Sequence, residues 1–169
     1  VTGNVDIYSE RWTAVGSLAA GRGGHTATVL TDGTVLVAGG GSTAGLQAPC
    51  ERYNPDRGTW AAAAGLAAGR REHSATLLAD GSVLVAGGAG TAGPLSSCER
   101  YDAAAGTWTA AAPMAAPRQE HTATLLRDGR VLVAGGGAGA ATACEIFDPA
   151  SGAWSASSPL GSGRARHAA

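Results

Sequence analysis

A 19-residue stretch that recurs along the chain constrains the fold more than any other feature of the sequence. Its middle copy, from Arg70 to Gly88, reads RREHSATLLADGSVLVAGG. Two further complete copies begin at Arg22 and Arg118, and a fourth copy opens at Arg164. The histidines of the complete copies follow one another at intervals of 48 residues. A fixed period of this length indicates a repeat architecture, in which each unit buries its apolar face only against its neighbours.

Each complete copy predicts a β-hairpin that ends in two glycines. In the middle copy, two apolar runs are separated by Asp80 and Gly81, a dipeptide that favours a two-residue type I′ turn. The second run, VLVA, shows no polar alternation, which is typical of a strand buried on both faces. Glycines at its end permit a positive φ or a close approach of backbone. The three glycine pairs are Gly39 and Gly40, Gly87 and Gly88, and Gly135 and Gly136.

Two further strands complete each repeat. The third strand reads CERY at 50–53 and at 98–101, and CEIF at 144–147. The fourth strand carries a tryptophan. The loops between the second and third strands differ from one repeat to the next, at 41–49, 89–97 and 137–143. We therefore expect four short antiparallel strands per repeat, stacked face to face on those of the next repeat.

The repeat resembles the kelch repeat in its bacterial form, which is also found in the propeller domain of galactose oxidase-like proteins. The resemblance is carried by the Arg-x-x-His start, the double glycine, the Glu-x-Tyr strand and the spaced tryptophan, and it covers essentially the whole chain. It implies an all-β fold, a segment of a kelch-type β-propeller with about three complete four-stranded antiparallel blades and partial blades at both ends. It implies little about function, because one fold carries many unrelated activities. The repeat positions expected to serve the fold are Arg22, His25, Gly39, Gly40, Glu51, Trp60, Arg70, His73, Gly87, Gly88, Glu99, Trp108, Arg118, His121, Gly135, Gly136, Glu145 and Trp154.

We expect a single kelch-repeat domain over residues 1–169. Its parts would be a half blade at 1–15, full blades at 22–63, 70–111 and 118–157, and the start of a next blade at 164–169. Propellers remove exposed sheet edges by closing the ring. We therefore expect a part of a larger propeller, closed through the remaining blades of a longer chain. A four-bladed ring with 164–169 beside 1–15, and self-association of several copies, are the alternatives.

The repeated charged, imidazole and thiol side chains are expected to stabilise the blades. One arginine and one glutamate per repeat, such as Arg70 and Glu99, predict an ion pair between neighbouring blades. The histidine of each repeat is expected to bond a neighbouring backbone or side chain, and convergence of the histidines on a metal in the channel is the alternative. The cysteines stand at equivalent positions, too far apart for a disulfide, and are expected as buried free thiols. These cysteines are Cys50, Cys98 and Cys144.

Charge and motifs argue against several classes of protein. The formal net charge is −1, so no nucleic-acid partner is expected. No apolar run approaches the roughly 20 residues of a membrane-spanning helix. No helix follows the glycine-rich stretches to hold a phosphate, and no nucleophile lies beside a base, so we expect no catalytic residue, cofactor or metal. Tyr8, Tyr53 and Tyr101 share one repeat position, so the copper chemistry of galactose oxidase-like enzymes is not carried over.

The two residues between the arginine and the histidine of each copy vary where the rest of the motif does not. They are Gly23 and Gly24, Arg71 and Glu72, Gln119 and Glu120, and Ala165 and Arg166. In kelch domains that bind peptides, the comparable positions face the ligand-binding mouth of the ring. The resemblance therefore places Arg71, Glu72, Gln119, Glu120 and Arg166 on a binding rim, together with the loops between the second and third strands.

From these features we expect a non-catalytic binding or scaffold module for a protein, peptide or carbohydrate. One alternative is the propeller portion of a galactose oxidase-like or other secreted enzyme whose catalytic residues lie outside this segment. Another is a set of purely structural blades within a larger assembly. The sequence leaves the compartment open, and the resemblance to bacterial kelch proteins favours a secreted or cell-envelope location.

Overall fold

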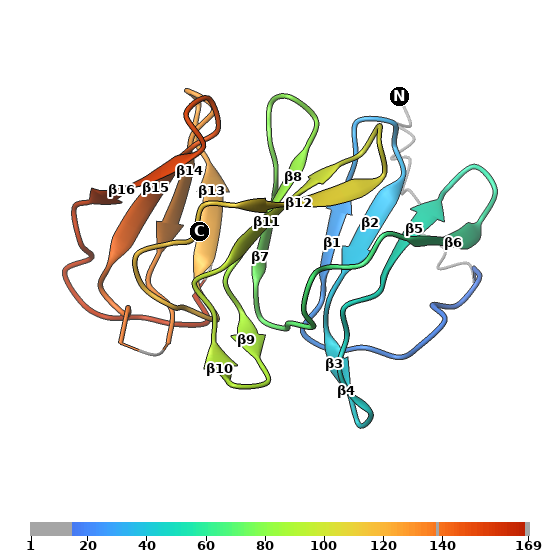
Figure 1. Ribbon diagram of the computed structural model, residues 1–169, viewed down its shortest axis with the longest axis horizontal. Coiled ribbons are helices and arrows are strands. Elements are labelled where there is room, and N and C mark those ends of the chain that lie inside the picture. The colour runs from blue at the N-terminus through green and yellow to red at the C-terminus, as the bar shows by residue number, and fades with distance from the viewer. Residues whose placement is uncertain (1–14, 138, 168–169) are drawn as a thin grey trace, which may run out of the picture.

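The computed structural model describes residues 15–137 and 139–167, which form three four-stranded antiparallel sheets (Figure 1). The first sheet contains β1 (Thr26–Val29), β2 (Val35–Ala38), β5 (Cys50–Asn54) and β6 (Thr59–Ala63). The second contains β7 (Ser74–Leu77), β8 (Val83–Ala86), β11 (Cys98–Asp102) and β12 (Thr107–Ala111). The third contains β13 (Thr122–Leu125), β14 (Val131–Ala134), β15 (Cys144–Asp148) and β16 (Ala153–Ser157). The expected all-β fold of four-stranded blades is confirmed.

The half blade expected at 1–15 lies outside the described residues, except for Val15. The strand expected to follow His167 lies outside them as well. Within the described ranges, the structure contains no helix long and apolar enough to cross a membrane.

The three blades stand side by side, and their first strands are the innermost. Strand β7 lies next to both β1 and β13, and the fourth strands β6, β12 and β16 form the outer edges (Figure 1). Among the described residues, the core consists of the two interfaces between blades, because each blade is a single sheet that buries its faces against its neighbours. In the first interface, Val83 and Val85 of the second blade pack against Leu36 and Cys50 of the first. In the second interface, the equivalent residues are Val131, Val133, Leu84 and Cys98.

The linkers between blades each contribute one large apolar side chain to these interfaces. Leu66 is buried between the first and second blades, and Met114 between the second and third. The VLVA strand is buried at all four positions only in the middle blade. In the third blade, Leu132 and Ala134 are half-buried, because no further sheet among the described residues covers that face.

The turn between the first two strands of each blade differs from the expected two-residue type I′ turn. In the first blade, the backbone N–H of Leu30 donates to the carbonyl of Thr34, which closes a three-residue loop. Among its residues, Gly33 has a positive φ of 80° and Asp32 does not. This geometry is the three-residue hairpin that ends in a left-handed glycine. Asp32 Oδ1 accepts hydrogen bonds from the backbone N–H and the hydroxyl of Thr34, and these bonds favour the longer loop.

The double glycine after the second strand lets the next repeat approach very closely. A Cβ built on Gly39 would lie 2.5 Å from the carbonyl oxygen of Arg70, well inside van der Waals contact. The N–H of the following residue, Gly40, donates to that same carbonyl at 2.8 Å. The other two copies repeat the bond, from Gly88 to Arg118 and from Gly136 to Arg164. Glycine is therefore required here by backbone contact between blades.

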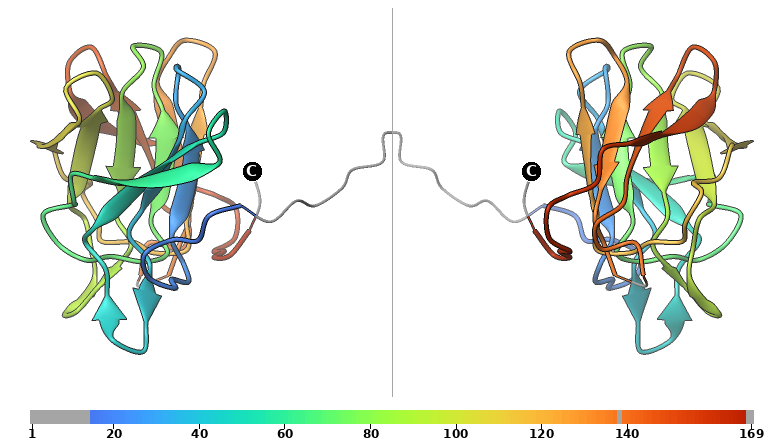
Figure 2. Two further views of the ribbon diagram at one scale, coloured as in Figure 1. Left: turned by 90° about the vertical axis from the view of Figure 1, so that its right-hand side faces the viewer. Right: turned by 90° about the vertical axis from the view of Figure 1, so that its left-hand side faces the viewer.

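Two of the variable loops between the second and third strands form small hairpins, which the sequence analysis did not predict. The first hairpin pairs β3 (Gly41–Ser42) with β4 (Gly45–Leu46), and the second pairs β9 (Ala89–Gly90) with β10 (Gly93–Pro94). Both protrude from the same end of the molecule, opposite the turns that join β1 to β2 and β7 to β8 (Figures 1 and 2). The third loop, 137–143, is two residues shorter than the others, and its described residues contain no such strand pair.

Candidate binding face

The arginine and glutamate of each repeat form a buried ion pair, but within one repeat rather than between blades as expected. Nη2 of Arg70 lies 2.7 Å from Oε1 of Glu99. The guanidinium also donates to the carbonyls of Gly87 and Ser97, and the second oxygen of Glu99 accepts the backbone N–H of Ala67 in the preceding linker. The pair thus ties a blade to the linker that enters it. The equivalent pairs are Arg22 with Glu51 and Arg118 with Glu145.

His73 and His121 connect neighbouring blades through hydroxyl groups, whereas Nδ1 of the exposed His25 contacts the carbonyl oxygen of Arg22 in its own repeat. Nε2 of His73 is hydrogen-bonded to the hydroxyl of Thr26 at 2.9 Å, and Nε2 of His121 to that of Ser74 at 2.9 Å. Burial, assisted by the positive charge of Arg70, lowers the pKa of His73 to about 3. Burial and Arg118 lower the pKa of His121 to about 4. Both imidazoles are therefore neutral at physiological pH and act as fixed links between the inner strands.

The remaining repeat positions lie against the blade interfaces and their outer edge. Cys50, Cys98 and Cys144 are buried and free, and burial raises the pKa of the Cys98 thiol to about 11. Trp108 is half-buried on the outer strand, with its ring centroid 5.0 Å from that of Tyr101. Its Nε1 donates to the carbonyl of Ala64 in the preceding linker at 2.8 Å. The groups Trp60 with Tyr53 and Trp154 with Phe147 repeat this arrangement.

The variable two-residue slots adopt an unusual backbone conformation. Glu72, Glu120 and Arg166 have φ values of 56°, 57° and 54°, and they are the only non-glycine residues with positive φ in the described parts of the chain. The first repeat has Gly24 at this position, with φ of 68°. A side chain in the left-handed region costs roughly 1–2 kcal/mol for residues other than glycine. The fold thus accepts glycine here, while three repeats carry a strained charged residue.

A chain of backbone hydrogen bonds places these strained residues side by side. The N–H of Glu72 donates to the carbonyl of Gly24, that of Glu120 to Glu72, and that of Arg166 to Glu120, at 2.8, 3.0 and 2.9 Å. Their side chains, together with His73, His121 and His167, line a shallow depression of about 290 Å³ at the inner strands. We call this depression the axial mouth. Nη2 of Arg166 lies 2.5 Å from Oε1 of Glu120, and the Arg166 side chain is 77% exposed.

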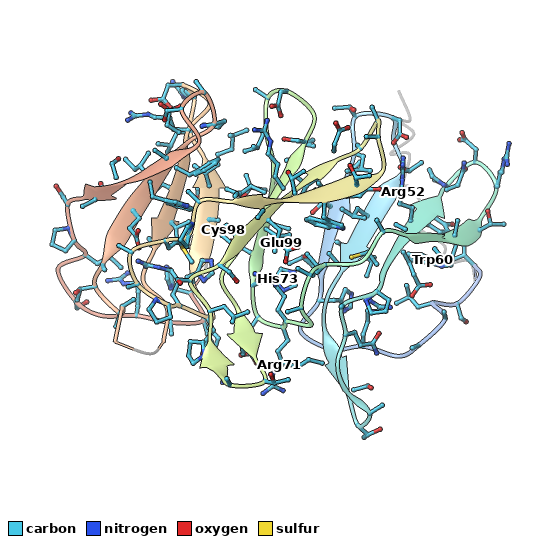
Figure 3. The ribbon with its side chains drawn as sticks, in the orientation of Figure 1. Arg52, Trp60, Arg71, His73, Cys98 and Glu99 are labelled. Atoms are coloured by element: carbon cyan, nitrogen blue, oxygen red, sulfur yellow. The ribbon has the colours of Figure 1, made fainter. Side chains whose placement is uncertain are left out.

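A second depression lies beside the axial mouth, between the two protruding hairpins. We call it the hairpin groove, and its volume is about 630 Å³. It is lined by Gly41, Ser42, Thr43, Gly45, Leu46, Arg71, Ala89, Gly90 and Thr91. Figure 3 shows Arg71 between the hairpins, on the end of the molecule from which they protrude. The groove therefore unites a slot residue with the loops between the second and third strands, two features that the sequence had indicated separately.

Arg71 spans the boundary between the first two blades. Its backbone pairs with Ala89 of its own repeat in an isolated antiparallel bridge. Its side chain reaches the preceding repeat, because a Cβ built on Gly41 would lie 3.8 Å from Cδ of Arg71. The third repeat has Gln119 at the corresponding position, and that side chain lies along Gly137 of its own loop. The sequence had indicated both residues for the rim, but only Arg71 lines the hairpin groove.

Comparison with known proteins agrees with this architecture. Residues 70–115 match the family model described as the Kelch motif. The repeat is a kelch repeat. Among solved structures, the one titled "Structure of YjhT" resembles the chain with a TM-score of 0.76 at 18% sequence identity. The likeness covers 92% of this chain and 57% of that one, so the chain spans little more than half the length of YjhT. No curated protein matches the sequence.

The kelch repeats and the likeness to YjhT confirm the kelch-type β-propeller fold expected from the sequence. An identity of 18% carries the fold alone, because site residues diverge faster than scaffolds. Within residues 15–137 and 139–167, no group of three or more His, Cys, Asp or Glu side chains is arranged to hold a metal ion. Of the tyrosines considered for copper, Tyr53 and Tyr101 pack on tryptophan rings, and Tyr8 lies outside the described residues.

Proposed function

We propose that this kelch segment is a non-catalytic binding module whose ligand face combines the axial mouth and the hairpin groove. The ligand would be a protein, peptide or carbohydrate with polar groups. Arg71, Glu72, Glu120 and Arg166 would contact it directly, and Gln119 would contribute from the rim of the third blade. The repeated arginines, glutamates and histidines of the blades would hold these side chains in place.

The observation that carries the proposal is the strained backbone of Glu72, Glu120 and Arg166. Gly24 occupies the same conformation without a side chain, so folding does not require charged residues at these positions. Backbone strain that folding does not demand is found preferentially at ligand sites. All three strained residues border one depression, and the slot residue next to Glu72 enters the adjoining groove. The module would therefore recognise a polar ligand that carries charged groups.

The test compares the wild-type protein with Arg71→Ala and Glu120→Ala on arrays of peptides, proteins and glycans. The Arg71 side chain is 54% exposed, so its substitution should change the free energy of unfolding by no more than about 0.5 kcal/mol. The Glu120 side chain is 14% exposed and pairs with the exposed Arg166, so its substitution should cost no more than about 1 kcal/mol and leave the protein folded. Binding to the ligands that the wild type retains should weaken in both variants. If both variants unfold, the residues are structural. If both are stable and bind every retained ligand as the wild type does, this face is not the site.

A further inference from the structure

The hairpin groove is positively charged at one point only, and this feature identifies the chemistry of a ligand. Of the nine residues that line the groove, Arg71 is the one that carries a charge. Its side chain is 54% exposed, and its nearest described carboxylate is that of Glu72, 3.8 Å from Nε. No hydrogen bond from the terminal nitrogens of Arg71 is formed within the described residues, so both remain free to donate. A free guanidinium edge matches the two oxygens of a carboxylate.

The walls of the groove present backbone more than side chains. Gly41, Gly45 and Gly90 are among the lining residues, and Ser42, Thr43 and Thr91 add hydroxyl groups. A Cβ built on Gly45 would have no neighbour within 4 Å, so this wall is open to a ligand. Glycine in a short strand is typical of places where another backbone approaches closely. None of the nine lining residues offers an aromatic ring for a sugar face to stack on.

We propose that the hairpin groove binds an extended acidic peptide segment, with Arg71 donating two hydrogen bonds to an aspartate or glutamate side chain. The segment would lie between the β3–β4 and β9–β10 hairpins, with its backbone against the glycine-rich walls. The groove's volume of about 630 Å³ is within the range of roughly 300–1,000 Å³ that ligand sites usually have. This inference rests on the proposed function, since it specifies the ligand class at one part of the same face.

The decisive experiment exploits charge reversal at Arg71. A display library of random linear peptides would be selected on the wild type, on Arg71→Glu and on Arg57→Glu. Arg57 is an exposed residue of the turn between β5 and β6, so its substitution makes the same change of net charge away from the groove. Peptides selected on the wild type and on Arg57→Glu should be enriched in aspartate and glutamate. The Arg71→Glu variant should lose this enrichment and favour lysine and arginine.

Two binding measurements on a recovered acidic peptide complete the test. Arg71→Ala should raise its dissociation constant at least about tenfold, the usual effect of losing a hydrogen-bonded charge pair. Thr43→Trp should abolish binding of the same peptide. Thr43 is exposed in the turn between β3 and β4, so the indole would fill the groove without changing any charge. Melting curves would verify that both variants fold.

Each of the following outcomes would overturn the inference. The first is a selection on the wild type that enriches no peptide. The second is a set of enriched peptides without an excess of aspartate and glutamate. The third is an acidic peptide that binds Arg71→Ala as tightly as it binds the wild type. Binding of oligogalacturonate that depends on Arg71, without peptide binding, would assign the carboxylate to a carbohydrate instead. Peptides without acidic residues that bind the wild type but bind Glu120→Ala more weakly would contradict an acidic ligand in the hairpin groove. The same result would still support the proposed binding face.

Discussion

Arg70 and Glu99 form an ion pair of 2.7 Å in which both side chains are more than nine-tenths buried. The pair lies within one kelch repeat, yet its second carboxylate oxygen holds the backbone of the linker from the previous blade. Removal of one partner would leave the other as an unpaired charge in the interior.

We expect Arg70→Met to lower the free energy of unfolding by about 3–5 kcal/mol, because Glu99 would remain buried and unpaired. Urea unfolding monitored by tryptophan fluorescence would measure the change. The matched control is Arg52→Met, whose partner Asp32 is 54% exposed, and it should cost no more than about 1 kcal/mol. Equal effects of the two substitutions would contradict the burial of the Arg70 pair.

The repeated tryptophans Trp60, Trp108 and Trp154 are half-buried, so removal of one should cost less than removal of a fully buried indole. We expect Trp108→Phe to cost about 1 kcal/mol, the usual contribution of the lost hydrogen bond from Nε1 to Ala64. Trp108→Ala also loses the contact with Tyr101 and should cost about 2–3 kcal/mol, below the range for fully buried rings. Thermal and urea unfolding of the two variants would check this order. A Trp108→Phe variant as stable as the wild type would show that the hydrogen bond from Nε1 does not contribute to stability.

The strain at the slots predicts that glycine would stabilise the fold. Glu120→Gly relieves the left-handed conformation and should raise the free energy of unfolding by up to about 1 kcal/mol. The gain is reduced by loss of the ion pair with Arg166, whose exposed side chain makes that pair weak. The reverse change, Gly24→Ala, introduces the same strain at φ of 68° and should destabilise by a similar amount. Denaturation curves in which Glu120→Gly is clearly less stable than the wild type would refute this assignment of strain.

The buried histidines predict a loss of stability in mild acid. In the unfolded chain a histidine has a pKa near 6.5, while the folded pKa is about 3 for His73 and about 4 for His121. The unfolded state therefore binds more protons below pH 6.5, and stability is complete only above that pH. As pH falls from 6.5 towards 4, each histidine should remove about 1 kcal/mol per pH unit.

Urea unfolding at pH 7.5, 6.5 and 5.5 would measure this dependence above the range in which carboxylates titrate. The matched control is the double variant His73→Gln and His121→Gln, which should show a flatter profile over the same range. A wild-type profile without slope between pH 6.5 and 5.5 would mean that the imidazoles are accessible to protons in the folded state.

The cysteines should resist chemical modification in the folded protein. Burial raises the pKa of the Cys98 thiol to about 11 and also raises that of Cys50, so little reactive thiolate forms at pH 8. Mass spectrometry after iodoacetamide treatment should find few modified thiols in the native protein and three after unfolding without a reductant. Detection of an intramolecular disulfide would contradict the equivalent placement of the cysteines.

Much of the fold follows from the sequence because the same pattern of apolar residues, glycines and aromatic residues occurs in each repeat. The two apolar runs around Asp-Gly, the segment that begins with Cys-Glu and the segment with the tryptophan predicted four strands per blade. The turn type was predicted incorrectly, because Asp-Gly signals a tight turn but cannot indicate that Asp32 bonds to Thr34 and so extends the loop. The ion pair between Arg70 and Glu99 could be recognised, but its placement within a repeat depends on the path of the linker.

By itself, the sequence determined the period, the all-β architecture, the buried strands and the residues that vary between repeats. These properties depend on local conformational preference and on which side chains avoid water. Tertiary structure alone decided that Glu72, Glu120 and Arg166 adopt a strained backbone and adjoin one another. It also decided that Arg71 crosses from its own blade into a groove between two hairpins. Such relationships join residues of different repeats, and they arise only when the blades pack together and fix the distance between their backbones.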